Sequence, residues 1–91
     1  MTHIARQVRL TGMVQGVFFR AWTREQAERL DIHGWVRNCA DGSVEAHVEG
    51  GEAAVEQLIQ LLKHGPSGAR VDHIEISDAA VEHADWFVVR H

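Results

Sequence analysis

Apolar and polar residues alternate in two parts of the chain and follow a helical period in two others. Residues 7–14 and 44–48 alternate, which is typical of β-strands with one buried face. Between residues 55 and 62 apolar residues recur every three or four positions, and between residues 19 and 30 the apolar residues Phe19, Trp22, Ala27 and Leu30 are interspersed with charged residues. Those two segments are predicted to form amphipathic helices.

Shorter signals predict the remaining elements. Residues 35–39 indicate a strand before the hairpin signal Asp41-Gly42, and residues 71–76 and 86–89 indicate two more strands. The resulting order, β-α-β-β-α-β with a short last strand, predicts an α+β fold of the ferredoxin-like, split β-α-β type. We expect one domain over residues 1–91, with an antiparallel sheet and both helices on one face.

Composition excludes several classes of protein. Of the 91 residues, 45% are apolar and 24% charged, which is the balance of a soluble globular domain. No apolar run approaches the ~20 residues that span a bilayer, and the N-terminus lacks the apolar stretch of a signal peptide. One cysteine, Cys39, permits no internal disulfide, so we expect a cytoplasmic protein. The net charge of −4 disfavours binding to nucleic acid.

Eight of the nine basic residues are arginines, and the ninth is Lys63. Arginine presents a planar fork of donors that suits phosphate and carboxylate, whereas lysine is a point charge. A general preference for arginine at surface positions explains most of the eight. The predicted topology indicates which arginine lies at a candidate binding site.

In the predicted fold the first and second strands are parallel, so Val14 and Asn38 lie at the same edge of the sheet. Ligands bind at such carboxyl edges. Gly16, in the loop before Arg20, permits backbone angles that turn several N–H groups toward one anion. A plain strand-to-helix turn explains the same residues. Phe18 and Phe19 are expected to anchor this loop in the core.

Two blocks of sequence resemble the acylphosphatase family. Residues 12–20 read GMVQGVFFR and match the pattern G-x-V-Q-G-V-x-F-R, and residues 34–44 read GWVRNCADGSV and match G-W-V-x-N-x-x-D-G-x-V. Glu49-Gly50 and Gly65-Pro66 also lie where the family carries E-G and G-P. Departures occur at Leu61 and in the last six residues. The resemblance covers nearly the whole chain.

The resemblance implies hydrolysis of carboxyl-phosphate mixed anhydrides to a carboxylate and inorganic phosphate, without a metal, a cofactor or a covalent intermediate. It implies that Arg20 binds the phosphoryl group and that Asn38 positions the attacking water. The phosphate-binding loop is then Gln15, Gly16, Val17, Phe18, Phe19 and Arg20. The expected partner is a small acyl phosphate, with no nucleic acid or membrane, and the protein is expected to be a monomer. Neither block identifies the acyl group.

Other candidate groups have simpler explanations. Strand alternation directs Cys39 away from the face of Asn38, so a structural thiol is favoured over a nucleophile. The seven histidines lack metal-ligand spacing and are predicted to lie on the surface. Asp41 is interpreted as a turn residue. The carboxylate of His91 is a further candidate, because it could approach Arg20 and compete with substrate.

A non-catalytic ferredoxin-like module that binds a small ligand or RNA is the alternative hypothesis, because fold alone does not decide function. An RNA-binding sheet needs exposed aromatic residues on its central strands and a basic face. The strand over residues 44–48 has no phenylalanine, tyrosine or tryptophan, and the net charge is negative. A regulatory module is ordinarily joined to a larger enzyme, and the length of this chain favours a free-standing enzyme. A related domain also occurs in hydrogenase-maturation carbamoyltransferases, which keeps carbamoyl phosphate among the candidate substrates.

Overall fold

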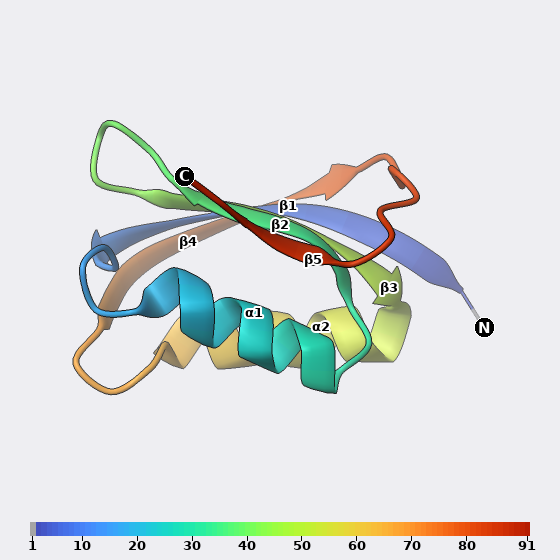
Figure 1. Ribbon diagram of the computed structural model, residues 1–91, viewed down its shortest axis with the longest axis horizontal. Helices are drawn as coiled ribbons and strands as arrows, with labels where there is room; N and C mark the ends of the chain where they lie inside the picture. Colours follow the sequence, from blue (N-terminus) through green and yellow to red (C-terminus); the bar gives the residue numbers. More distant parts are fainter. Residues whose placement is uncertain (1) are drawn as a thin grey trace.

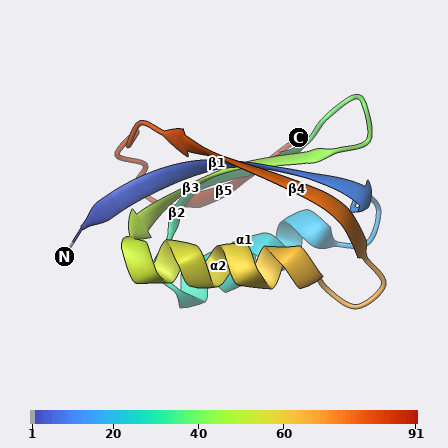
Figure 2. The same cartoon turned by 180° about the vertical axis from the view of Figure 1, so that it is seen from behind.

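The computed structural model describes residues 2–91 and shows a five-stranded sheet with two helices packed on one of its faces (Figure 1). The elements in chain order are β1 (His3–Met13), α1 (Phe19–Arg29), β2 (His33–Asn38), β3 (Val44–Gly51), α2 (Glu52–His64), β4 (Arg70–Ala79) and β5 (Phe87–Arg90). The strand order is β4-β1-β3-β2-β5. Figure 2 shows both helices beneath the same face from behind. The predicted ferredoxin-like arrangement is confirmed.

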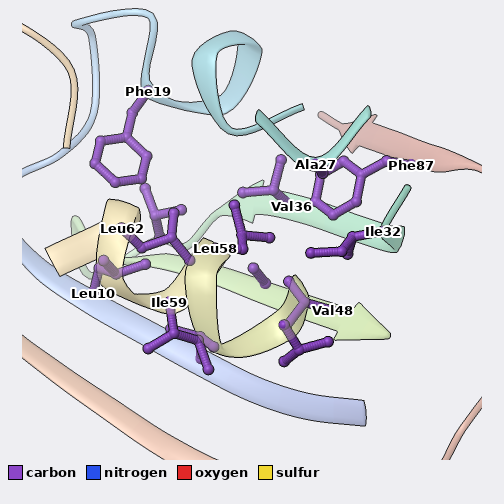
Figure 3. Close-up of a cluster of buried hydrophobic side chains, with 14 of the residues drawn as sticks. Leu10, Phe19, Ala27, Ile32, Val36, Val48, Leu58, Ile59, Leu62 and Phe87 are labelled. Atoms are coloured by element: carbon purple, nitrogen blue, oxygen red, sulfur yellow. The ribbon is translucent and has the colours of Figure 1, made fainter. Parts of the chain in front are cut away.

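The hydrophobic core lies between the helices and this face of the sheet (Figure 3). The four residues of the predicted stripe in α2 are all buried, and α1 contributes Phe19 and Ala27. The sheet contributes the inward-facing residues of its central strands, Val8, Leu10, Val36, Val44, Ala46 and Val48. The periodicity of the sequence therefore identified most of the core.

The sheet is mixed, which corrects the prediction of an antiparallel sheet. Strands β1, β2, β3 and β4 pair antiparallel, but β5 pairs parallel to β2. Strand β4 occupies the opposite edge of the sheet from β5 and ends at the same end of the sheet as the start of β2, so the chain crosses that end before it pairs along the free edge of β2 (Figure 1). A strand that starts there and follows β2 runs in the same direction. Local sequence contains no signal for this pairing.

Strand β1 also differs from its predicted range, because it begins at His3 and ends at Met13. It pairs with both β3 and β4, and the register with β4 shifts between Thr11 and Gly12. A bulge of this kind bends a strand and redirects the chain that follows. Val14 then lies just beyond the strand and is fully buried.

His47 is a second correction, since it is only 2% exposed and is no surface histidine. It lies on β3, on the face opposite Val48, and its Nε2 is 2.8 Å from the carboxylate of Glu49. Glu49 accepts hydrogen bonds from the backbone N–H groups of Glu82 and Ala84, at 2.7 and 2.6 Å. The segment between β4 and β5 is thus fastened over the outer face of the central strand.

Gly34 explains how β2 and β3 approach each other. Its φ is +136°, and a Cβ at this position would lie 1.9 Å from the carbonyl oxygen of His47. Any side chain would therefore separate the strand that carries Asn38 from its neighbour.

Within residues 2–91, no helix is both long enough and apolar enough to cross a membrane.

Candidate active site

Three strand ends and one helix start meet at one edge of the sheet. Strands β1 and β2 both run antiparallel to β3, and β5 runs parallel to β2, so their carboxyl ends share this edge. The expected convergence of Val14 and Asn38 is therefore confirmed. A pocket of about 320 Å³ lies here, lined by Val14, Gly16, Phe18, Phe19, Arg20, Ala21, Asn38, Val89 and His91.

The loop between β1 and α1 turns through two residues with positive φ. Gly16 has φ +74° and Phe18, which caps the start of α1, has φ +59°. A Cβ on Gly16 would meet no atom within 4 Å, so the backbone conformation, and not space, favours glycine there. Phe18 adopts the left-handed conformation in spite of its side chain.

The backbone N–H groups of this loop are available to a ligand. The first hydrogen bond of α1 runs from Trp22 N–H to the carbonyl oxygen of Phe18, at 2.9 Å. Within the described part of the chain, no backbone acceptor pairs with the N–H groups of residues 16–21. Free N–H groups together with the positive end of a helix favour an anion.

Arg20 differs from the other arginines in its surroundings. Six of them have a carboxylate within 4.0 Å, and Arg90 lies over the ring of Trp35 with 4.5 Å between guanidinium and centroid. Across residues 2–91, no carboxylate is within 4.0 Å of the Arg20 guanidinium. The charge of Arg20 is therefore available to an anion in the pocket.

The end of the chain holds Arg20 in place. Arg20 Nη1 donates a 2.8 Å hydrogen bond to the carbonyl oxygen of Arg90 and lies 3.3 Å from Nδ1 of His91. The carboxylate of His91, a candidate partner of Arg20 from the sequence, makes no ion pair with it within residues 2–91; a peptide carbonyl and an imidazole make the contacts instead. A neutral acceptor positions the guanidinium and leaves its positive charge uncompensated.

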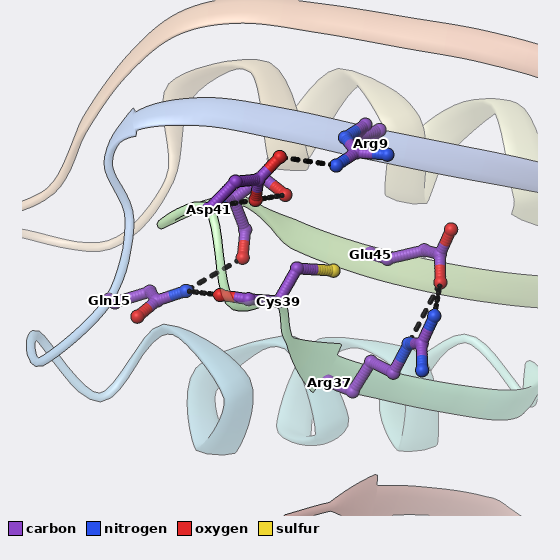
Figure 4. Close-up of polar contacts among 7 residues, drawn as sticks. Arg9, Gln15, Arg37, Cys39, Asp41 and Glu45 are labelled. Carbon is purple, nitrogen blue, oxygen red and sulfur yellow. Dashed lines mark hydrogen bonds and ion pairs between the residues drawn. The ribbon is translucent and has the colours of Figure 1, made fainter.

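Asn38 is the last residue of β2, paired with Val44, and its exposed side chain lines the pocket. Gln15 fastens the loop to the hairpin that follows Asn38, because its Nε2 donates to the carbonyl oxygens of Cys39 and Ser43 at 2.9 and 2.8 Å (Figure 4). The loop that was predicted to bind phosphate is therefore hydrogen-bonded to the hairpin that begins directly after Asn38, the residue predicted to position water.

Asp41 closes the same hairpin and confirms its interpretation as a turn residue. Its Oδ1 accepts hydrogen bonds from the side chain and the backbone N–H of Ser43, at 2.6 and 2.9 Å. These bonds, with the guanidinium of Arg9 beside the other oxygen, lower the pKa of Asp41 to about 2 (Figure 4). The turn is thus held by an ionised carboxylate at neutral pH.

Most of the predicted site residues line the pocket, but the side chains of two of them make other contacts. Gly16, Phe18, Phe19, Arg20 and Asn38 line it, whereas the side chain of Gln15 holds the hairpin and Val17 packs against the core. The prediction that both phenylalanines anchor the loop is correct for Phe19, which is 2% exposed, and wrong for Phe18, which is 86% exposed.

Two lining residues were not predicted from the sequence. Ala21 follows Arg20 on α1 and carries no chemical signal. Val89 reaches the pocket through the parallel pairing of β5 with β2, in which it lies opposite Val36. The sequence contains no signal for that pairing, so Val89 could not be predicted to line the pocket.

From the sequence, Cys39 was favoured as a structural thiol over a nucleophile and the histidines as surface residues over metal ligands, and the structure shows where these side chains lie. Cys39 is half-buried and is not among the lining residues. Among residues 2–91 there is no group of three or more His, Cys, Asp or Glu side chains placed to hold a metal ion.

Comparison with known proteins identifies the family. Residues 6–89 match the family model for acylphosphatase. An acylphosphatase of Rhizobium etli is 50% identical over 78 residues, covering 86% of this chain and 83% of the relative. One of Bifidobacterium longum is 44% identical over 89 residues, covering 96% and 92%.

Solved structures agree. An acylphosphatase from Coxiella burnetii superposes with a TM-score of 0.93 at 36% identity, covering 97% of this chain and 93% of the other. A structure of full-length HypF, in a phosphate- and nucleotide-bound form, contains a similar region with a TM-score of 0.88 at 28% identity, over 12% of its length. The BLUF protein BlrB, 19% identical with a TM-score of 0.69, shares the fold alone. On the family match and the relatives together, this chain belongs to the acylphosphatase family of hydrolases, whose reaction is the hydrolysis of acyl phosphates.

Proposed function

We propose that Arg20 and the N–H groups of residues 15–20 bind the phosphoryl group of an acyl phosphate, and that Asn38 positions the water that attacks it. The observation that carries this assignment is the surroundings of Arg20. It lines a pocket beside free N–H groups and Asn38, and it has no carboxylate partner in the described chain. The positive charge of Arg20 and the free N–H donors are complementary to the negative charge and acceptor oxygens of a phosphoryl group.

The reaction needs few groups from the protein. Water attacks phosphorus in line with the bridging oxygen, the phosphorus–oxygen bond to the acyl group breaks, and the carboxylate leaves with the bonding electron pair. The proton of the water passes to a phosphoryl oxygen, so the products are a carboxylate and inorganic phosphate. A carboxylate is a stable leaving group that requires no proton from an acid. Positioning and stabilisation of charge on the phosphoryl oxygens are then sufficient.

Arg20 and the loop supply that stabilisation. Nη1 of Arg20 is held by the carbonyl of Arg90, whereas Nε and Nη2 have no hydrogen-bond acceptor among residues 2–91. These two nitrogens form one edge of the guanidinium and suit two oxygens of a phosphoryl group. Arg70 shows the same mode in this protein, since its Nε and Nη2 bind the two carboxylate oxygens of Asp72 at 2.9 and 3.2 Å.

Asn38 contributes a carbonyl oxygen that accepts and an amide that donates, and it does not titrate. It can therefore hold a water in line without acting as a base, the role of a glutamine in small GTPases. Its place at the end of β2, joined to the loop by Gln15, keeps that water at a fixed distance from the bound phosphoryl group.

The test is release of benzoate from benzoyl phosphate in the presence of a chelator. We expect the wild type to be active and Asn38→Ala to lose about 10²–10³-fold in kcat, with little change in inhibition by inorganic phosphate. Gln57→Ala, which removes an amide on the exposed face of α2, is the matched control and should retain activity.

Two outcomes would count against the proposal. If the wild type releases no benzoate, the alternative of a non-catalytic binding module gains support. If Asn38→Ala weakens phosphate inhibition as strongly as it lowers kcat, Asn38 binds the phosphoryl group and does not position water.

The proposal extends to the organisation of the protein: a cytoplasmic monomer with one domain over residues 1–91 and no nucleic-acid partner. The family match over residues 6–89 and one contiguous hydrophobic core support a single domain. The lone thiol of Cys39 is compatible with a reducing compartment. Light scattering after gel filtration measures the mass in solution, and a dimer would contradict the proposal.

A further inference from the structure

The lining of the pocket divides into two chemical groups. Arg20, Asn38 and the backbone at Gly16 are polar, and the proposed function assigns them to the phosphoryl group and the water. The remaining carbon-lined surface comes largely from Phe18, Ala21 and Val89, because Val14 and Phe19 are buried in the core. A charged phosphoryl group gains nothing from contact with this apolar surface. An apolar acyl group attached to the phosphoryl group would be stabilised by burial against it.

Phe18 is the largest accessible apolar side chain at the pocket. It is 86% exposed, whereas the adjacent Phe19 is 2% exposed. Its φ of +59° is unfavourable for a residue with a Cβ, and it directs the ring away from the core that receives Phe19. The loop therefore presents an aromatic face to solvent at the mouth of the site, where burial against a ligand would be favourable.

The charges at the pocket limit the acyl group further. Among the lining residues Arg20 is the one lysine or arginine, and no aspartate or glutamate is present. Once Arg20 binds the phosphoryl group, a second anionic group on the substrate meets no further lysine or arginine side chain among the lining residues, which otherwise supply the amide of Asn38, the imidazole of His91 and apolar side chains. The site thus has one strongly anion-binding side chain beside a largely apolar surface.

We propose that Phe18 determines substrate specificity by contacting the acyl group, and that the preferred substrates are acyl phosphates with an aromatic or extended apolar acyl group. Acetyl phosphate is too small to cover the Phe18 ring, and an acyl phosphate with a second negative charge finds no further lysine or arginine there. This inference rests on the proposed function, because it takes the phosphoryl group to be bound at Arg20.

The experiment compares kcat/KM for benzoyl phosphate and acetyl phosphate in the wild type, Phe18→Ala, Phe18→Gly and Phe18→Tyr. We expect the benzoyl-to-acetyl ratio to fall about tenfold in the alanine and glycine variants and to stay near the wild-type ratio in the tyrosine variant. Glycine accepts a positive φ without strain, so agreement between the alanine and glycine variants assigns the effect to the ring. Met13→Ala removes another exposed apolar side chain (54%) that does not line the pocket, and it should leave the ratio unchanged.

A substrate with a second negative charge tests the expected preference for uncharged acyl groups. Wild-type kcat/KM for 4-carboxybenzoyl phosphate should be below that for benzoyl phosphate, and equal or higher values would overturn this preference. A ratio unchanged in Phe18→Ala would overturn the role of the ring. So would an equal loss with both substrates accompanied by weaker phosphate inhibition, because the ring would then act through the loop. Failure of the wild type to hydrolyse either substrate would instead contradict the proposed function itself.

Discussion

Arg20 on α1 and Arg90 at the end of β5 are joined by a 2.8 Å hydrogen bond from the guanidinium of the first to the carbonyl oxygen of the second. The side chain of Arg90 in turn lies over Trp35 of β2, and Trp35 stacks on the buried His47 of β3. The guanidinium proposed to bind phosphate is therefore held by the last strand, and that strand is held by the outer face of the sheet. Four predictions concern this arrangement and the hairpin beside it.

Arg20→Lys should lower kcat/KM for benzoyl phosphate by about 10²–10³-fold, because the ammonium keeps the charge but loses the paired donors of the guanidinium edge. Arg29→Lys, at the other end of α1, retains its exposed position near Glu25 and serves as the matched control. Steady-state kinetics of both variants decide the point. Near wild-type activity in Arg20→Lys would show that charge alone is sufficient.

Removal of His91 should inhibit the enzyme more than replacement of its side chain. Without His91, the Arg90 carbonyl that contacts Arg20 becomes a terminal carboxylate, and a negative charge there competes with the phosphoryl group. We expect KM to rise about tenfold in the shortened protein and the effect to weaken at high salt. His91→Ala keeps the neutral carbonyl and should change KM by less than about threefold. Equal effects of the two changes would contradict this account.

Gln15→Ala should lower both stability and turnover. Two hydrogen bonds to the carbonyls of Cys39 and Ser43 are lost, which costs about 1–3 kcal/mol of unfolding free energy and loosens the hairpin that carries Asn38. Urea unfolding and kcat with benzoyl phosphate measure the two effects. Gln60→Ala, on the exposed face of α2, is the control. A destabilised Gln15→Ala variant with unchanged kcat would separate the hairpin from the reaction.

Glu49 should make stability fall in acid. Burial raises the pKa of this carboxyl, but hydrogen bonds from His47 and from the backbone N–H groups of Glu82 and Ala84 outweigh burial and hold the pKa below its ordinary value of 4.5. A carboxyl with a lowered pKa in the folded state stabilises the fold above its ordinary pKa, and this contribution is lost as the pH falls through the folded-state pKa.

Glu49→Gln should therefore be less stable than the wild type at pH 7, by roughly 1–3 kcal/mol, and should lose less stability than the wild type between pH 5 and 3. Unfolding in urea at a series of pH values measures both effects. Glu56→Gln, on the exposed face of α2, should follow the wild type. Parallel pH profiles for Glu49→Gln and the wild type would show that Glu49 does not contribute to the acid sensitivity.

Local sequence was sufficient to predict the helices and most of the strands. The alternation in β3 and the apolar stripe of α2 each place apolar side chains on one face of the element. Any packing of this chain must bury that face, so the pattern is visible in the local sequence. Gly16 requires no tertiary information either, because its positive φ is a local property of the turn. The placement of Arg20 and Asn38 at one edge follows from the order of elements and the handedness of their crossovers.

Only the tertiary structure decided which side chains surround those two residues. Gln15 was grouped with the phosphate-binding loop, but its partners are carbonyls 24 and 28 residues away. Phe18 and Phe19 are the same residue type, yet the ring of Phe18, which has a positive φ, is exposed and the ring of Phe19 is buried in the core. His47 is buried because a distant segment covers it. Such contacts depend on pairing between remote parts of the chain, such as β5 beside β2, and periodicity within one segment carries no information about its remote partners.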